Sequence, residues 1–297
     1  MPARLELRAP AKINLTLEVI GRRPDGYHEL ATIMQTIDLC DTVCIEAADS
    51  ISIEFRGERA ADVPFDPRQE LAHRAADLMS GWLKAPRGAR IVVDKQIPAG
   101  AGLGGGSSDA AAVLRGLNAL WGLGRDAKSL ARSAARLGSD VPFFIYCGSA
   151  LCRGRGEIVD PLTDGRAAAV TLFLPKERIE NKTATMYSLI QKSDYTAGTA
   201  TRGMADDIAV RGEALLDGRN VFDRYAWRFG ESVAVAMDAC NRAGFEVHFA
   251  GSGPAFFALR PREELPPREA ALMEYLGIEV RQHSFLPKEA ALAVKET

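Results

Sequence analysis

A run of glycines that leads into a helix constrains this chain more than any other feature. Residues 98–112 read PAGAGLGGGSSDAAA, with five glycines between Gly100 and Gly106. Glycine reaches positive φ and lets a ligand approach the main chain closely. The alanines favour a following helix, for which Ser107 or Ser108 is the expected N-cap. Because free N–H groups at a helix N-terminus attract anions, the segment predicts a phosphate site.

Two other kinds of nucleotide loop are a poor match for this segment. Gly100-x-Gly102-x-x-Gly105 has the spacing of the dinucleotide fingerprint, and a strand-like stretch at 91–94 precedes it. That fingerprint needs a second parallel strand with an acidic residue about 20 positions on, whereas a glycine turn and a helical segment at 126–137 follow here. The Walker loop needs Gly-Lys-Ser/Thr, which does not follow these glycines. An ordinary glycine-rich turn is the simplest alternative, and the Ser-Ser-Asp that follows favours the phosphate site over it.

Composition limits the classes of protein to which the chain can belong. It has 297 residues, 47% of them hydrophobic, which is enough for one large or two medium domains. Its formal charge of −2 argues against nucleic acid or anionic membrane as a partner. The five cysteines show no zinc spacing and indicate reduced thiols in a cytoplasmic protein. No secretory signal is expected, and no apolar run approaches the roughly 20 residues of a membrane span.

Strand and helix patterns alternate along the chain and predict an α+β fold. A composition change near 160–166 predicts domains at 1–163 and 164–297. Period-2 alternation is typical of strands, and apolar residues three and four apart are typical of helices. The expected strands include 4–9, 13–19, 29–37 and 41–46, and the expected helices include 70–83 and 220–243.

Three segments of the sequence carry a family resemblance: PAKINLTLEVIGRRPDGYHEL (10–30), PAGAGLGGGSSDAA (98–111) and FAGSGPAFFAL (249–259). They resemble the signatures of the GHMP kinases, the superfamily of galactokinase, homoserine kinase and mevalonate kinase. The DGYHEL portion is most similar to the branch that acts on a cytidine diphosphate-linked methylerythritol in non-mevalonate isoprenoid synthesis. The sequence departs from the family pattern at 220–223 (NVFD) and at Ala255.

The resemblance implies a fold and a reaction. The fold is the two-domain α+β GHMP kinase fold, with a first domain similar to domain 2 of ribosomal protein S5 and a ferredoxin-like second domain. The reaction is transfer of the γ-phosphate of ATP, with Mg²⁺, to the 2-hydroxyl of the methylerythritol unit. The expected partners are these small molecules, and the expected state is a monomer or a weak homodimer.

The resemblance also implies roles for individual residues. Lys12 and Asp140 match the catalytic pair, in which Asp140 accepts the hydroxyl proton and Lys12 holds the carboxylate ionised. Ser108 is a candidate Mg²⁺ ligand. Asn14 and Thr183 match positions that bind polar groups of the substrate, and Tyr27 and His28 match those that bind the cytidine. The expected ATP-binding residues are Lys95, Pro98, Ala99, Gly100, Ala101, Gly102, Leu103, Gly104, Gly105, Gly106, Ser107 and Ser108.

Three alternatives remain at this point. The first is another GHMP kinase, of the homoserine or mevalonate type, against which DGYHEL argues. The second is a non-catalytic relative that binds a nucleotide or sugar, against which the presence of both Lys12 and Asp140 argues. The third is a nucleic-acid binder, which the charge of −2 disfavours.

Overall fold

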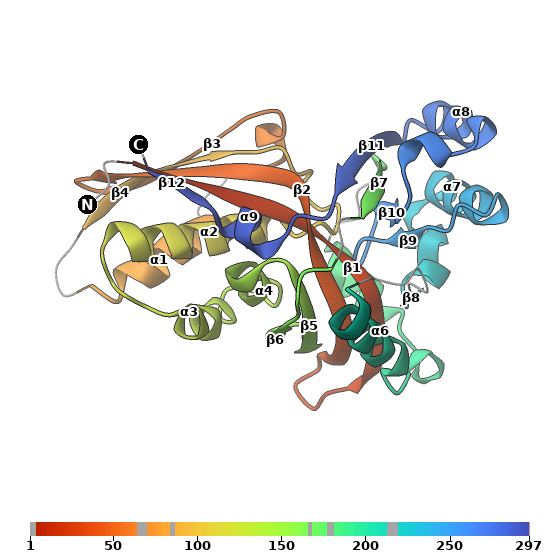
Figure 1. The fold of residues 1–297 in the computed structure, drawn as a ribbon, viewed down its shortest axis with the longest axis horizontal. Coiled ribbons are helices and arrows are strands. Elements are labelled where there is room, and N and C mark those ends of the chain that lie inside the picture. Colours follow the sequence, from red (N-terminus) through yellow and green to blue (C-terminus); the bar gives the residue numbers. More distant parts are fainter. Residues whose placement is uncertain are drawn as a thin grey trace.

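The chain folds around two β-sheets that lie side by side (Figure 1). The structure is a computed structural model that describes residues 4–63, 70–83, 87–165, 168–176, 181–212 and 219–296. The strands of the first sheet are β1 (Arg4–Arg22), β2 (His28–Ala48), β3 (Ile51–Arg56), β4 (Gly88–Asp94), β5 (Ser149–Gly154), β6 (Ile158–Pro161), β8 (Arg219–Asn220) and β12 (Val294–Glu296). The strands of the second sheet are β7 (Ala169–Leu174), β9 (His248–Phe249), β10 (Phe256–Ala258) and β11 (Glu279–Ser284).

The helices and 3-10 turns occupy the connections between these strands. Those of the first half are η1 (Ala60–Asp62), α1 (Leu71–Ser80), α2 (Gly105–Leu120), α3 (Ala127–Ala134) and α4 (Val141–Tyr146). Those of the second half are α5 (Lys182–Ser188), η3 (Lys192–Asp194), α6 (Thr199–Arg211), η4 (Asp223–Phe229), α7 (Glu231–Arg242), η5 (Arg262–Glu264), α8 (Pro267–Tyr275) and α9 (Lys288–Leu292).

Two long antiparallel strands, β1 and β2, form the spine of the first sheet, whose main order is β12-β1-β2-β4-β3. The sequence predicted two strands in each of these segments, and this expectation was wrong. The pairing shifts between Pro10 and Ala11, where two residues of β2 bulge out while the strand continues. Proline donates no ladder hydrogen bond, and a bulge absorbs the irregularity without ending the strand. The single long strand carries residues from the sheet core to the site.

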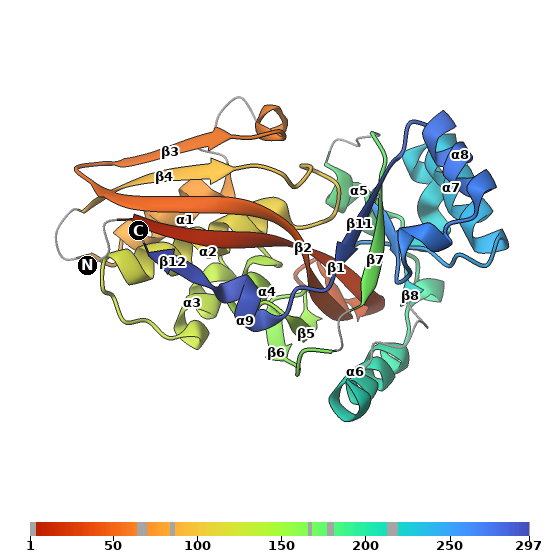
Figure 2. The same ribbon diagram turned by 45° about the horizontal axis from the view of Figure 1, so that its top comes forward.

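Helices α1 to α4 cover one face of the first sheet (Figures 1 and 2). Leu5, Leu7, Val43 and Ile45 alternate along β1 and β2, and all are buried in the same cluster as the apolar residues of α2. Gly116 lets α2 approach the sheet, because a Cβ there would lie 2.4 Å from a side-chain carbon of Ile45. This close packing holds α2, whose first turn contains the last glycines of the glycine segment, against the sheet.

The second sheet has the order β11-β7-β10-β9, and α7 and α8 lie against it. Numbered along the chain, its strands run 4-1-3-2, with α7 directly before the second strand and α8 before the fourth, the arrangement of a ferredoxin-like fold. The α+β fold class is therefore confirmed. Phe173 and Phe256 stack at 4.6 Å between ring centroids in the core beneath these helices.

Strand β7 is buried on both faces and thereby joins the two halves of the molecule. Phe173 faces the helices, whereas Leu172 and Leu174 belong to the cluster that contains Ile13 and Ile33 of the first sheet. The last strand, β12, returns to pair with β1. The expected boundary at 163/164 falls between β6 and β7, and it stays a prediction.

The segment predicted as one helix at 220–243 contains three elements, so this expectation was wrong. β8 ends at Asn220, η4 ends at Phe229, and α7 begins at Glu231 after Gly230, whose φ is +105°. The amide of Asn220 donates to the carbonyls of Phe249 and Gly251 at 2.8 Å each. Because that side chain bonds the turn at 250–253, the break in the helix helps to hold one wall of the site.

Candidate active site

A cavity of about 1460 Å³ lies where the glycine segment, β1, β2, α5 and the turn at 250–253 meet. Its volume exceeds the roughly 300–1,000 Å³ of ordinary single-ligand pockets, which is consistent with two substrates. The site residues predicted from the sequence line it, with the exception of Ser108: Lys12, Asn14, Tyr27, His28, Lys95, the residues from Pro98 to Ser107, Asp140 and Thr183.

The glycine segment forms a loop that ends directly in α2. Gly100, Gly102 and Gly104 all have positive φ, between +74° and +92°. The helix begins at Gly105 with Gly104 as its N-cap, and that cap makes no side-chain hydrogen bond. The predicted serine N-cap was therefore wrong, because the left-handed Gly104 starts the helix earlier and places the serines in its first turn. The first-turn N–H groups are left for a ligand or water.

Close backbone contacts hold this loop on both sides. A Cβ on Gly102 would lie 2.9 Å from the carbonyl oxygen of Gly253, and one on Gly104 would lie 2.8 Å from the Phe144 ring. The N–H of Lys12 donates to the Leu103 carbonyl at 2.9 Å. Packing thus requires glycine at positions 102 and 104, and the lack of side chains also lets a ligand approach the main chain.

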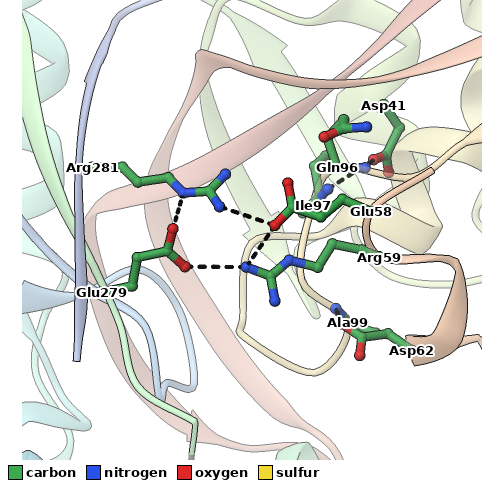
Figure 3. A network of polar contacts seen from close by, with 9 residues as sticks. All are labelled: Asp41, Glu58, Arg59, Asp62, Gln96, Ile97, Ala99, Glu279 and Arg281. Carbon is green, nitrogen blue, oxygen red and sulfur yellow. Dashed lines mark hydrogen bonds and ion pairs between the residues drawn. The ribbon is translucent and has the colours of Figure 1, made fainter. Parts of the chain in front are cut away.

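Carboxylates support the entrance of the loop (Figure 3). Asp41 accepts hydrogen bonds from the N–H groups of Gln96 and Ile97, and Asp62 accepts one from that of Ala99 at 3.3 Å. Asp41 lies on β2 and Asp62 lies on η1, and both elements come before the loop in the chain. The two carboxylates fix the path of the main chain before it reaches the glycines.

Lys95 lines the cavity, but buried carboxylates balance its charge. Its ammonium pairs with Asp41 and, at 2.5 Å, with Asp109. Burial lowers the pKa of Lys95, while the charges of Asp109 and Asp41 raise it further, and the net direction is upward. The ammonium therefore stays charged, and its predicted contact with the nucleotide stays a prediction.

Lys12 and Asp140 come together in the cavity, with 3.8 Å between Nζ and Oδ2. Lys12 is buried near the middle of β1, where its Nζ also donates to Asn14 Oδ1 at 2.6 Å. Burial lowers the pKa of Lys12 more than Asp140 raises it. Asp140 stands just before α4 with its side chain one-third exposed (33%), so a ligand in the cavity can reach it. A carboxylate beside an ammonium at a phosphate loop can accept the proton of an attacking hydroxyl.

An aromatic cluster lies at the same cavity. The His28 ring stacks on Tyr187 at 5.5 Å between centroids. Tyr27 is 53% exposed, and the Arg155 guanidinium lies over its ring at 4.7 Å. Thr183 and Tyr187 are four residues apart on α5 and so share one helix face. Flat rings with a cationic rim are suited to stacking a nucleobase.

The lining residues that escaped the sequence reasoning include Glu70, Arg155, Lys182 and Tyr187. The spacing of Thr183 and Tyr187 was a usable signal for Tyr187 once Thr183 was assigned. The carboxylate of Glu70 lies 3.6 Å from where a Gly106 Cβ would be, and burial raises its pKa. Nothing in the sequence indicates that α1 brings Glu70 to the loop.

Comparisons with known proteins decide the family. The sequence profile of the GHMP kinases N terminal domain matches residues 70–148. The chain is 40% identical over 263 residues to a 4-diphosphocytidyl-2-C-methyl-D-erythritol kinase of Brevibacillus brevis, an alignment that covers 88% of this chain and 89% of the relative. The chain belongs to this kinase family. A family member from Bacillus subtilis is 39% identical over 85% of the chain and 86% of its own length.

Solved structures agree with the family assignment. A 4-(cytidine 5'-diphospho)-2C-methyl-D-erythritol kinase superposes with a TM-score of 0.75 at 35% identity, covering 94% of this chain and 98% of its own. A homoserine kinase from Cytophaga hutchinsonii has a TM-score of 0.73 at 17% identity, with 99% and 98% covered, and this likeness concerns the fold alone. The predicted GHMP kinase membership is confirmed. In the described part of the chain, every helix is too short or too polar to cross a bilayer.

Proposed function

We propose that the protein transfers the γ-phosphate of ATP to the 2-hydroxyl of 4-diphosphocytidyl-2-C-methyl-D-erythritol. One observation carries the proposal: the Lys12–Asp140 pair and the glycine loop at the start of α2 line one cavity. The names of the relatives and of the similar solved structure support the substrate. The five thiols are all unpaired, which supports a reducing, cytoplasmic setting.

The loop and the catalytic pair have separate roles in the transfer. N–H groups of the glycine loop and the N-terminus of α2 hold the triphosphate. Asp140 takes the proton of the 2-hydroxyl as that oxygen bonds to the γ-phosphorus, and the bond to the departing ADP breaks. Lys12 pairs with Asp140 and stabilises the charge on the phosphoryl group during its transfer. Most of the rate enhancement then comes from positioning and charge, as is general for this chemistry.

The aromatic cluster binds the acceptor in this proposal. Tyr27 and His28 hold the cytosine, with Tyr187 behind His28, while Asn14 and Thr183 bind polar groups of the acceptor. Stacking positions a base without using hydrogen bonds. Binding of the base at one end brings the 2-hydroxyl to Asp140 at the other.

The residues at the loop are compatible with Mg²⁺. The hydroxyl of Ser108 is buried without a hydrogen-bond partner among the described residues, and Glu70 places a carboxylate against Gly106. Clusters of three or more His, Cys, Asp or Glu ligands are absent from the described residues. That pattern is usual for Mg²⁺, which keeps several waters and takes one or two protein ligands beside phosphates. We propose that Ser108 and Glu70 hold the ion, which neutralises phosphate charge when bound.

A substrate panel tests the proposal. The purified protein is incubated with ATP, Mg²⁺ and one acceptor at a time: the cytidylated methylerythritol, homoserine or mevalonate. Release of ADP is followed by a coupled assay, and the product by ³¹P NMR. We expect ADP and a new phosphomonoester with the cytidylated acceptor alone. Equal turnover of mevalonate or homoserine would favour another GHMP kinase, and turnover of none would favour a relative that binds without transfer.

A further inference from the structure

A second buried lysine, Lys182, enters the cavity from the opposite half of the molecule. It is the first residue of α5, and it lines the cavity together with Lys12. A cation at a helix N-terminus is electrostatically unfavourable, because that end of the helix is positive. The stability of α5 therefore does not explain why a lysine stands at position 182.

Both lysines donate to the turn at 250–253. The Nζ of Lys12 lies 3.4 Å from the Ala250 carbonyl oxygen, and the Nζ of Lys182 lies 2.5 Å from that of Gly253. The Gly253 carbonyl is also the atom against which Gly102 packs. The two ammonium groups thus flank one turn, and the glycine loop rests on that turn.

The charges around Lys182 do not balance. The charged groups that face it are Lys12 on β1 and Asp140 before α4, while the turn at 250–253 offers carbonyl oxygens. Lys182 makes no ion pair within the described ranges, and the carboxylate of Asp140 contacts Lys12. Burial, together with the charge of Lys12, lowers the pKa of Lys182 to about 7. Two ammonium groups beside one carboxylate leave a positive site that an anion would stabilise.

We propose that Lys182, together with Lys12, binds the phosphoryl group that is transferred. The inference rests on the proposed kinase function and deepens it. Its ammonium bonds the Gly253 carbonyl, against which Gly102 of the glycine loop packs, and the charge of Asp140 acts on it. The γ-phosphate must lie between that loop and Asp140 during the transfer, within the cavity that Lys182 lines. Lys182 makes no covalent bond, and it donates hydrogen bonds to a non-bridging phosphoryl oxygen as charge moves onto that group.

Nucleotide binding without acceptor tests this assignment. The affinities for ATP and ADP, both with Mg²⁺, are measured by calorimetry for the parent, Lys182→Gln and Lys182→Arg. Since a charge-assisted hydrogen bond is lost, Lys182→Gln is expected to weaken ATP binding by about tenfold or more. ADP binding should be unchanged because ADP has no γ-phosphate. Lys182→Arg keeps the charge and should retain most of the preference for ATP over ADP.

The pH dependence supplies a readout that a merely structural lysine would not change. In the free protein Lys182 is protonated below about pH 7 and neutral above. Affinity for ATP relative to ADP should therefore fall as the pH rises through 7 in the parent. Arginine stays charged over this range, so Lys182→Arg should lose that part of the dependence. Comparing the two proteins removes the titration of ATP itself.

The control and the contrary outcomes are distinct. Lys192→Gln removes another cavity-lining lysine, on η3, and should leave the ATP-to-ADP ratio unchanged. The proposal is overturned if Lys182→Gln keeps the parent's preference for ATP, or if it raises the KM for the acceptor alone. The latter result would place Lys182 on the acceptor's diphosphate. Failure of the proposed function looks different: the parent would release no ADP with the acceptor, while its ATP-to-ADP ratio could still be measured.

Discussion

At the scale of single residues, Asp140 is the group on which turnover depends most. Asp140→Asn keeps the size of the side chain but removes the oxygen that takes the proton. We expect kcat to fall by about 10²–10⁴-fold, which is the usual contribution of a general base. The KM for ATP should change little, because the glycine loop binds the nucleotide. The coupled ADP-release assay measures both constants.

The matched control for this substitution is Asp160→Asn. Asp160 is half exposed on β6, where it pairs with Arg153 at 2.6 Å, and it does not line the cavity. Its variant should retain parental kcat. If Asp140→Asn also stayed within about tenfold of the parent, the proton would have to leave by another route.

His248, on β9 of the second sheet, is expected to make the stability of the fold depend on pH. Its Nδ1 lies 2.7 Å from Asp223 Oδ2, and the N–H of Phe249 donates to the other carboxylate oxygen. Burial lowers the pKa of His248, but Asp223 and Glu246 raise it further, so the folded value lies above the unfolded one. The stabilisation is then complete below the unfolded pKa of about 6.5 and is lost as the pH rises through the folded pKa.

His248→Gln should therefore cost more stability at about pH 6 than at about pH 8.5. A hydrogen bond to a charged group contributes roughly 1.5–3 kcal/mol at most, and urea unfolding at the two pH values measures the difference. His73→Gln, on α1, is the control, since His73 makes no ion pair among the described residues. A cost independent of pH would mean that the imidazole acts through packing alone.

Sequence reasoning reached the residues that local pattern and motif identify, and missed those that only folding brings near. Lys12 and Asp140 match a motif, and both lie in the cavity. Lys182 stands beside the predicted Thr183, yet its own position carried no signal. Whether a lysine at the start of a helix faces solvent or a buried turn depends on how α5 packs against 250–253. That packing is tertiary, and no local pattern encodes it.

At the scale of elements, two glycines of the loop are required for different reasons that the sequence does not distinguish. Gly100 and Gly102 both have positive φ, but a Cβ on Gly100 would meet nothing within 4 Å, whereas one on Gly102 would clash with Gly253. Gly100→Ala should therefore cost only the backbone strain, about 1 kcal/mol. Gly102→Ala adds a steric contact with main-chain atoms that cannot give way.

We expect Gly102→Ala to raise the KM for ATP and to lower thermal stability more than Gly100→Ala does. An overpacked site typically costs a further 1–3 kcal/mol or so. Steady-state kinetics and thermal unfolding of the two variants provide the comparison, with Gly100→Ala as the matched control. Equal effects would show that strain alone, and not the contact with the turn, governs the loop.

Element boundaries were the weakest part of the sequence prediction, for reasons that are visible in the structure. Periodicity continues through 220–243, but Gly230 ends one helical segment and starts another. Similarly, the serines after the glycines have the chemistry of an N-cap, and Gly104 takes that place because its φ of +75° turns the chain first. Propensity ranks how well residue types suit a position such as the N-cap, whereas the path of the backbone determines which residue occupies that position.

At the scale of the whole molecule, the contact between the two sheets positions the site, and little in the sequence indicates that contact. Apart from Thr171, the residues of strand β7 are apolar, which is consistent with burial on both faces. The composition of the strand does not indicate which strands cover the second face. The structure shows that β1 and β2 do so, and the same strands carry Lys12 and His28 into the cavity. The strands that form the core between the two sheets therefore also position residues of the site.

A charge network crosses between the two halves near the loop (Figure 3). Glu279 on β11 contacts Arg59 at 3.1 Å and Arg281 at 2.5 Å, and Glu58 contacts both arginines. The N–H of Arg59 donates to the Lys95 carbonyl at 3.0 Å, directly before the loop. The network therefore connects the edge strand of the second sheet to the entrance of the nucleotide loop.

Glu279→Gln should raise the KM for ATP about two- to threefold at low salt. Arg59 then loses the Glu279 carboxylate and retains that of Glu58, and exposed pairs contribute roughly 0.2–1 kcal/mol. At about 1 M salt the Debye length falls to about 3 Å, so the parent and the variant should converge. Glu54→Gln is the control, since Glu54 pairs with Arg90 within the first sheet, away from the loop. A KM that differs equally at both salt concentrations would assign the effect to packing, and an unchanged KM would mean that the loop is held without the second sheet.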